Sequence, residues 1–222
     1  MRLVTALLVK DEADKYLRRV LDNALSFSDR VLLLNDNSHD ATPKIAKEMG
    51  CQVRGRSVLK ESAWGKEAPA RAELFQWASH EAGDGWILIQ DADQVLHGDP
   101  RPLMETWEAN AWAWPLYDCW DSETQYRADG YWQGYKQARV WMVRPSMVPP
   151  DWKPVWGDRG LHCGHIPPNF PMAALIAPDS LYWLHLGWMR EDHRVAKYAR
   201  YKAEASQLSP QEFAHVESIM DG

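Results

Sequence analysis

Hydrophobic and polar positions follow a strand–helix rhythm through the first half of the chain. Leu3–Val9 is a near-continuous apolar run, as expected of a strand that is covered on both faces, and Val31–Leu34 and Trp86–Gln90 repeat this pattern. Cys51–Gly55 predicts a weaker strand of the same kind. Between these strands, apolar residues recur with helical spacing. The pattern predicts three helices, over Glu12–Ser26, from Thr42 to Gly50 and over Glu67–Ala82.

The alternation of strands and helices predicts an α/β fold with a mostly parallel central sheet and right-handed crossovers. In the second predicted helix, Thr42 has the position of the N-cap, Pro43 is the first helical residue and Gly50 ends the helix. The first predicted helix carries an apolar stripe formed by Leu17, Val20, Leu21, Ala24 and Leu25. The third turns Leu74, Trp77 and Ala78 inward.

The second half of the chain is less regular. Pro145–Pro171 is rich in proline, glycine, tryptophan and histidine, and this composition favours a long, ordered binding loop. Ser209 and Glu212 form a capping box at the start of a last helix. No repeat, linker or domain boundary is evident, so we expect a single domain over residues 1–222. The other predicted elements are Pro102–Glu108 (helix), Ala111–Leu116, Arg139–Val143 and Ser180–Leu186 (strands), and Glu191–Gln207 (helix).

Length and composition restrict the class of protein. A chain of 222 residues supports one α/β domain or two small ones, and no apolar run approaches the ~20 residues that span a bilayer. The apolar N-terminus meets Lys10 after a few residues and lacks a cleavage site, so we expect a buried strand and not a signal peptide. Three scattered cysteines match neither a zinc site nor a disulfide framework. We therefore expect a soluble, cytoplasmic protein without an integral membrane segment.

Charge and aromatic content narrow the ligand classes. A net charge of −6 argues against a sequence-independent polyanion binder, which usually carries a basic stripe. The chain has 13 tryptophans, most of them between Trp107 and Trp188. We expect most of these rings to pack in the core and in loops, and some to form stacking platforms for sugar rings or bases.

Polar residues follow three of the predicted strands directly. In open α/β sheets, ligands bind outside the carboxyl ends of the strands. The segments at these ends are Lys10–Glu12, Asn35–Asp40 and Asp91–Asp93. We therefore count Glu12 among the residues expected to contact a ligand.

Asp91 and Asp93 form a D-x-D pair at the end of a buried strand. Carboxylate oxygens suit hard cations such as Mg²⁺ and Mn²⁺, and a cation there could bridge to a diphosphate. Acidic pairs at strand ends are often only solvated turn residues, so the pair alone is a weak signal.

Two further segments and the context of the D-x-D pair strengthen the signal. Leu32–Thr42 resembles the V-D-x-x-S-x-D-x-T motif of glycosyltransferase family 2. Leu8–Glu12 resembles the V-K-N-E ending of one branch of that family. The stretch from Ala70-Arg71 through Gly85–Leu88 to Asp91–Asp93 resembles the segment that runs from a-R-N to D-A-D-E. The resemblance covers residues 1–98 well and the remainder loosely.

This resemblance implies a GT-A fold and the use of a nucleotide sugar, a UDP-, GDP- or TDP-sugar. It also implies a divalent metal, Mn²⁺ or Mg²⁺, and inversion at the anomeric carbon. Residues 1–98 would form the nucleotide-sugar-binding half of the domain, and residues 99–222 the acceptor-side half. The acceptor stays open among a glycan, a lipid-linked sugar, a protein and a modified nucleic-acid base. The sequence does not indicate an oligomeric state.

The resemblance also assigns roles to single residues. Asp36 would contact the nucleotide base or ribose, and Arg71 would lie near the diphosphate, where its fork of donors suits phosphate oxygens. Asp91 and Asp93 would be the D-x-D pair, with Asp93 the more direct metal ligand. Asp40 is expected to hold the loop or to cap the next helix. The chain departs from the family at Asn35, Ala72 and Gln94, where Asp, Asn and Glu are common.

A second cluster follows a late predicted strand. Tyr182–Trp188, followed by Arg194, Lys197 and Tyr198, resembles the closing segment of the same branch. By this resemblance His185 completes the metal shell. The alternative is a histidine packed in the core.

We expect the catalytic base in the aromatic loop Pro145–Pro171 of the second half. Inversion requires a carboxylate or histidine that deprotonates the acceptor hydroxyl. The family's H-E pair is replaced here by His162-Cys163, so its glutamate is missing. We predict Asp158 as the base, with His162 and His165 as alternatives. An ordinary loop turn is the other interpretation of Asp158.

Two other functions compete with glycosyl transfer. A nucleotidyltransferase on a related fold would also need a metal, but it would usually carry a Gly-rich basic loop where this chain has Lys10–Ala13. A non-catalytic module that retained the donor pocket is favoured slightly by the missing glutamate. The retained Asp36, Asp91 and Asp93 argue against that module.

Overall fold

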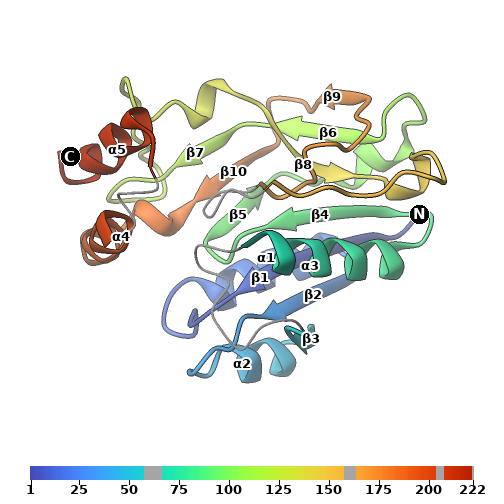
Figure 1. The fold of residues 1–222 in the computed structure, drawn as a ribbon, viewed down its shortest axis with the longest axis horizontal. Helices are drawn as coiled ribbons and strands as arrows, with labels where there is room; N and C mark the ends of the chain where they lie inside the picture. The colour runs from blue at the N-terminus through green and yellow to red at the C-terminus, as the bar shows by residue number, and fades with distance from the viewer. Residues whose placement is uncertain (58–66, 158–163, 204–207, 222) are drawn as a thin grey trace.

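The computed structural model describes residues 1–57, 67–157, 164–203 and 208–221 (Figure 1). In this part of the chain the strands form two sheets. The larger has the order β3 (Gln52–Gly55), β2 (Arg30–Asn35), β1 (Leu3–Val9), β4 (Trp86–Gln90), β8 (Arg139–Val143), β6 (Ala111–Trp114) and β9 (Ala174–Ile176). The smaller has the order β5 (Gln94–His97), β10 (Tyr182–His185) and β7 (Leu116–Asp118).

The predicted α/β fold with a mostly parallel sheet is confirmed. Strands β3, β2, β1 and β4 run parallel, and Leu7 of β1 pairs with Leu33 on one side and Gln90 on the other. Only β8, in the middle of the large sheet, runs antiparallel to its neighbours β4 and β6. Because the strands β1, β2 and β4 are parallel, their carboxyl ends meet at one edge of the sheet.

Helices cover both faces of the large sheet. On one face, α1 (Leu17–Phe27) and α2 (Thr42–Glu48) share one apolar core with alternate residues of β1 such as Leu3 and Leu7. On the other face, α3 (Glu67–Ala82) packs against Val4 and Ala6. The period-two alternation of a strand therefore separates two apolar cores. Helix α1 is also tied to the smaller sheet, since Asn23 exchanges hydrogen bonds with the backbone of Leu96.

The predicted N-termini of α1 and α2 were wrong. The first helix begins at Leu17 and not at Glu12, because Asp11 has a positive φ of 51° and the following residues form a turn. The second helix has Ala41 at its N-cap, and Thr42 is already helical. The Thr42 hydroxyl accepts a hydrogen bond from the Glu12 backbone instead, at 2.7 Å, so it joins the start of α2 to the loop after β1 and caps no helix.

The predicted strand Ala111–Leu116 is divided between the two sheets. Pro115 has no N–H to donate, and β6 ends directly before it. Its carbonyl accepts from the Trp183 backbone, which starts the pairing of β7 with β10. The predicted helix Pro102–Glu108 is a 3-10 turn over Arg101–Glu105, and Thr106 is extended. Strands β5 and β9 were not predicted.

The C-terminal helices lie together at one end of the molecule, beside the ends of β7 and β10 (Figure 1). The helix predicted over Glu191–Gln207 is α4 (Glu191–Ala203), beyond which residues 204–207 are not described. The predicted capping box of Ser209 and Glu212 is confirmed at the start of α5 (Pro210–Glu217). None of the described helices is both long and apolar enough to cross a membrane.

Candidate functional site

A cleft of about 1180 Å³ opens at the carboxyl edge of the parallel strands. Its walls come from the loops after β1, β2 and β4, from α3, and from the chain after β10 and on α4. Seven residues selected from the sequence line this one cleft: Glu12, Asp36, Arg71, Asp91, Asp93, His165 and His185.

The loops after β1 and β2 are bound to each other. Besides the bond from Glu12 to Thr42, the Ala13 backbone donates to Asp40 Oδ2 at 2.9 Å, and Asp40 Oδ1 accepts from the Thr42 backbone at 2.9 Å. The prediction that Asp40 holds this loop is therefore confirmed. These bonds place Glu12 in the wall of the cleft, where burial raises the pKa of its carboxyl although Lys15 opposes the shift.

Asp36 lies deep in the cleft at the end of β2. Only 3% of the residue is exposed, and its backbone N–H donates to the Val9 carbonyl at 2.8 Å. Arg56 Nε lies 3.2 Å from Asp36 Oδ1. An ionised carboxylate can stay buried here because a guanidinium compensates its charge.

Asp91 is held by two basic side chains. Arg71 Nη2 donates to Oδ1 at 3.0 Å, and His165 Nε2 lies 3.0 Å from Oδ2. Burial would raise the pKa of Asp91, but the charges of His165 and Arg71 bring it well below its usual value. The Asp91 backbone also donates to Gln94 Oε1 at 3.0 Å. The glutamine that replaces the family's glutamate thus fixes the D-x-D turn.

Asp93 points to a different set of partners. His185 Nε2 lies 3.3 Å from Asp93 Oδ2, and Lys197 Nζ donates to the same oxygen at 3.0 Å. The other ring nitrogen of His185, Nδ1, lies 2.7 Å from Asp118 Oδ1. The backbone N–H of Leu186 donates to the Asp93 carbonyl at 2.7 Å, which joins β10 to the D-x-D turn.

The pKa of His185 reflects this carboxylate environment. Burial opposes the charged imidazole, but the charge of Asp93 and the hydrogen bond to Asp118 outweigh it and raise the pKa to about 9. Burial also acts against the ionised form of Asp93, whereas Lys197 and His185 lower the pKa of that carboxyl below its usual range.

The donor atoms at Asp93 are of the kinds that could hold a divalent cation. A carboxylate oxygen and an imidazole nitrogen converge, and a carboxylate binds the second nitrogen of the same ring, as is typical of metal-ligating histidines. Across the described residues, no three His, Cys, Asp or Glu side chains form a metal-binding group. Two protein ligands would leave positions for the oxygens of a diphosphate. Asp91 is turned to Arg71 and His165, so its role as a direct ligand stays a prediction.

Two of the predicted catalytic residues lie outside the described part of the chain. These are Asp158 and His162, in the segment 158–163. The alternative base His165 lies within the described part of the chain. It contacts Asp91, and its ring centre lies 5.0 Å from that of Trp141. Sequence reasoning did not select Asp118. No local pattern around Asp118 marks it, because its partner His185 lies 67 residues further along the chain.

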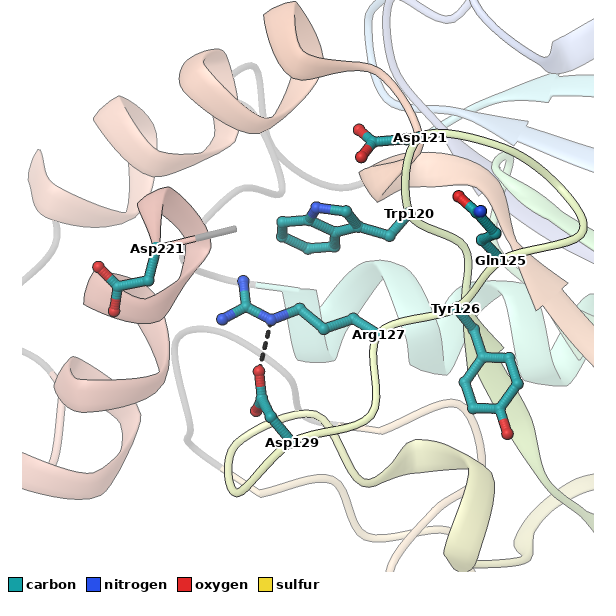
Figure 2. A pocket seen from close by; sticks show the side chains of 7 residues that line it. All are labelled: Trp120, Asp121, Gln125, Tyr126, Arg127, Asp129 and Asp221. Carbon is teal, nitrogen blue, oxygen red and sulfur yellow. Dashed lines mark hydrogen bonds and ion pairs between the residues drawn. The ribbon is translucent and has the colours of Figure 1, made fainter.

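A second hollow of about 490 Å³ lies near the C-terminus (Figure 2). Its central Arg127 donates to Asp129 Oδ2 and to the Ser218 carbonyl, each at 2.6 Å. The guanidinium groups of Arg127 and Arg194 lie 4.6 and 4.5 Å from the ring centre of Trp120. These contacts join the loop after β7 to the C-terminal turn, and we interpret the hollow as part of a structural joint.

The fold and the arrangement of the cleft define a glycosyltransferase of the GT-A type. The sequence profile described as Glycosyl transferase family 2 matches residues 7–148, and the chain belongs to this family. The family assignment favours glycosyl over nucleotidyl transfer and an enzyme over a non-catalytic module. The assignment to the V-K-N-E branch stays a prediction.

The chain is similar to several solved structures, and the first of them supports the same fold. The mannosyltransferase PcManGT from Pyrobaculum calidifontis, in complex with GDP-Man and Mn²⁺, is 13% identical with a TM-score of 0.52, covering 98% of this chain and 69% of its own. Glucosyl-3-phosphoglycerate synthase from Mycobacterium tuberculosis is 18% identical with a TM-score of 0.37, covering 53% and 44%. TarS from S. aureus is 14% identical with a TM-score of 0.40, covering 59% and 24%. No curated protein sequence matches the chain significantly.

Proposed function

We propose that the protein transfers a sugar from a nucleoside-diphosphate sugar to an acceptor hydroxyl, with a divalent cation at Asp93 and His185 and with inversion at the anomeric carbon. The observation that carries the proposal is the chain of contacts from Asp93 through His185 to Asp118. This chain lies in the same cleft as Asp36 and Arg71.

The residues of the cleft suggest how a donor is held. Asp36 and Glu12, at the ends of β2 and β1, would bind the nucleoside part, and Asp93 and His185 would face the diphosphate. Arg71, which contacts Asp91, would add a fixed positive charge beside the phosphates. A cation bound there would bridge the diphosphate oxygens and stabilise the charge of the leaving group.

The choice of cation follows from the donor atoms. Mg²⁺ prefers oxygen ligands, whereas Mn²⁺ binds carboxylate and accepts imidazole more readily. We therefore propose Mn²⁺ as the better cofactor of the two. The structurally similar mannosyltransferase was solved with GDP-Man and Mn²⁺, which makes this pair the first to test. UDP- and TDP-sugars are the other candidate donors to be tested.

The acceptor side requires a base. We retain Asp158 in this role, because Asp91 and Asp93 would serve the leaving group and neither is free to act as a base. A carboxylate in a loop rich in tryptophan would be partly desolvated, which would raise its pKa and improve it as a base near neutral pH. His162 and His165 are the alternatives.

Calorimetry of nucleoside diphosphate binding tests the proposal. Wild-type protein should bind GDP or UDP in the presence of Mn²⁺, and EDTA should abolish most of this affinity. His185→Ala should lose the metal-dependent part of the affinity. His80→Ala should behave like wild type, because His80 is exposed on α3 outside the cleft. Equal affinities with and without Mn²⁺, in wild type and His185→Ala alike, would contradict the proposed metal site.

A further inference from the structure

Lys197 contacts the carboxylate oxygen that a metal would need. Its Nζ lies 3.0 Å from Asp93 Oδ2, and His185 Nε2 lies 3.3 Å from the same atom. The side chain of Lys197 is 19% exposed, so its ammonium is largely withdrawn from water. This lysine comes from α4, about a hundred residues further along the chain than Asp93 (|i−j| = 104).

The position of this ammonium is built by the chain after β10. Lys197 Nζ lies 4.3 Å from the ring centre of Trp188, and this ring is held edge-on against Trp132 at 5.0 Å. A Cβ at Gly187 would lie 2.1 Å from Asp93 Oδ2 and 2.2 Å from Lys197 Nζ. The missing side chain of Gly187 therefore makes the contact between lysine and aspartate possible.

An ammonium and a divalent cation cannot share Asp93 Oδ2 without strong repulsion. Like charges a few ångströms apart repel more strongly in a partly buried site than in water, because the local dielectric constant is lower. Lysine differs from arginine in that its charge is a compact point on a flexible stem with three rotatable donors, so it can change partners by rotation. The diphosphate of the donor would supply a new anionic partner within the same cleft.

We infer that Lys197 is an exchangeable counter-cation, which holds Asp93 before the donor arrives and turns to the diphosphate of the nucleotide sugar when Asp93 binds the metal. This inference rests on the proposed function. It makes Lys197 a catalytic residue that contacts the leaving group. It also couples the binding of the metal to the binding of the nucleotide, so that each favours the other.

The inference predicts effects of opposite sign for one substitution. Without nucleotide, Lys197→Met should bind Mn²⁺ about tenfold more tightly than wild type, because a competing charged hydrogen bond to Asp93 is removed. With saturating Mn²⁺, the same variant should bind GDP or UDP about tenfold more weakly, because one cation no longer reaches the phosphates. A purely structural lysine would not give these opposite shifts.

Two further variants control the experiment. Lys202→Met removes the same charge from the same helix outside the cleft, where Lys202 pairs with Glu217, and should leave both affinities within about twofold of wild type. Lys197→Arg keeps the charge and should keep the weak Mn²⁺ affinity of the wild type. This variant keeps the test decisive if thermal unfolding shows that Lys197→Met is not folded.

Isothermal titration calorimetry with Mn²⁺ alone, and then with GDP or UDP in saturating Mn²⁺, gives both affinities. Unchanged or weaker Mn²⁺ binding by Lys197→Met, or tighter Mn²⁺ binding by Lys197→Arg, would overturn the inference while the wild type still binds nucleotide with metal. A wild type without any Mn²⁺-dependent nucleotide binding would overturn the proposed function and this inference together.

Discussion

Replacing Asp118 by asparagine tests whether this carboxylate supports the imidazole of His185, which we propose as a metal ligand. Asp118 Oδ1 lies 2.7 Å from His185 Nδ1, a short distance for a bond between a ring nitrogen and a carboxylate. Removal of a carboxylate that orients a ligating histidine usually weakens metal binding about 10- to 100-fold. Asparagine keeps the volume of the side chain, so the fold should be preserved.

A second effect of Asp118→Asn works in the opposite direction. The hydrogen bond that His185 donates to Asp118 contributes to the raised pKa of His185, about 9, and its loss lets the imidazole shed its proton more readily. A metal binds the neutral ring, so this change favours binding. With a pKa of about 9, the gain at pH 8.5 is at most about fourfold. The net expectation is Mn²⁺ binding about 3- to 30-fold weaker.

The assay is calorimetric titration of Mn²⁺ at pH 8.5 in the presence of GDP or UDP. Asp84→Asn is the matched control, because Asp84 is exposed in the turn before β4, at the opposite end of that strand from the D-x-D pair. Mn²⁺ affinity equal to wild type in Asp118→Asn would show that His185 does not need its carboxylate partner. It would thereby refute the argument that His185 ligates the metal.

Three other predictions address the same cleft. Mn²⁺ affinity of the wild type should rise with pH, by up to about tenfold per pH unit, and level off near the His185 pKa of about 9. An affinity that falls over this pH range would contradict the proposed role of His185 as a metal ligand. Gly187→Ala should lose Mn²⁺-dependent nucleotide binding, whereas Gly130→Ala, which meets nothing within 4 Å, should keep it. Asp158→Asn should keep donor binding and lower turnover by about 10²–10⁴-fold in a sugar-transfer assay. Wild-type turnover in that variant, with an inactive His165→Ala, would assign the base to a histidine.

Local sequence patterns were sufficient for the two central strands β1 and β4 of the large sheet. Strand β4 begins and ends where the apolar run Trp86–Gln90 predicts, and β1 matches Leu3–Val9. These strands are buried on both faces, so their composition alone identifies them. The polar residues at their ends then fall at the same edge because parallel strands end together.

The second half of the chain depends on contacts that are distant in sequence. Asp118 belongs to β7, a strand of three residues whose partner β10 lies more than sixty residues further along the chain, so no local pattern indicates that it supports His185. The pairing of Lys197 with Asp93 depends in the same way on where α4 packs. The turn before Leu17 was missed because the backbone N–H groups of Asp11 and Glu12 donate to the hydroxyls of Ser38 and Thr42, which holds this turn away from helical geometry.

The most direct test of the account measures the release of nucleoside diphosphate from a panel of UDP-, GDP- and TDP-sugars. Incubation with Mn²⁺ should release the diphosphate from at least one donor, by slow hydrolysis or by transfer to an added acceptor. EDTA and the variant Asp93→Asn should each abolish this release. Full release in metal-free buffer, together with an active Asp93→Asn, would contradict metal-dependent glycosyl transfer at this cleft.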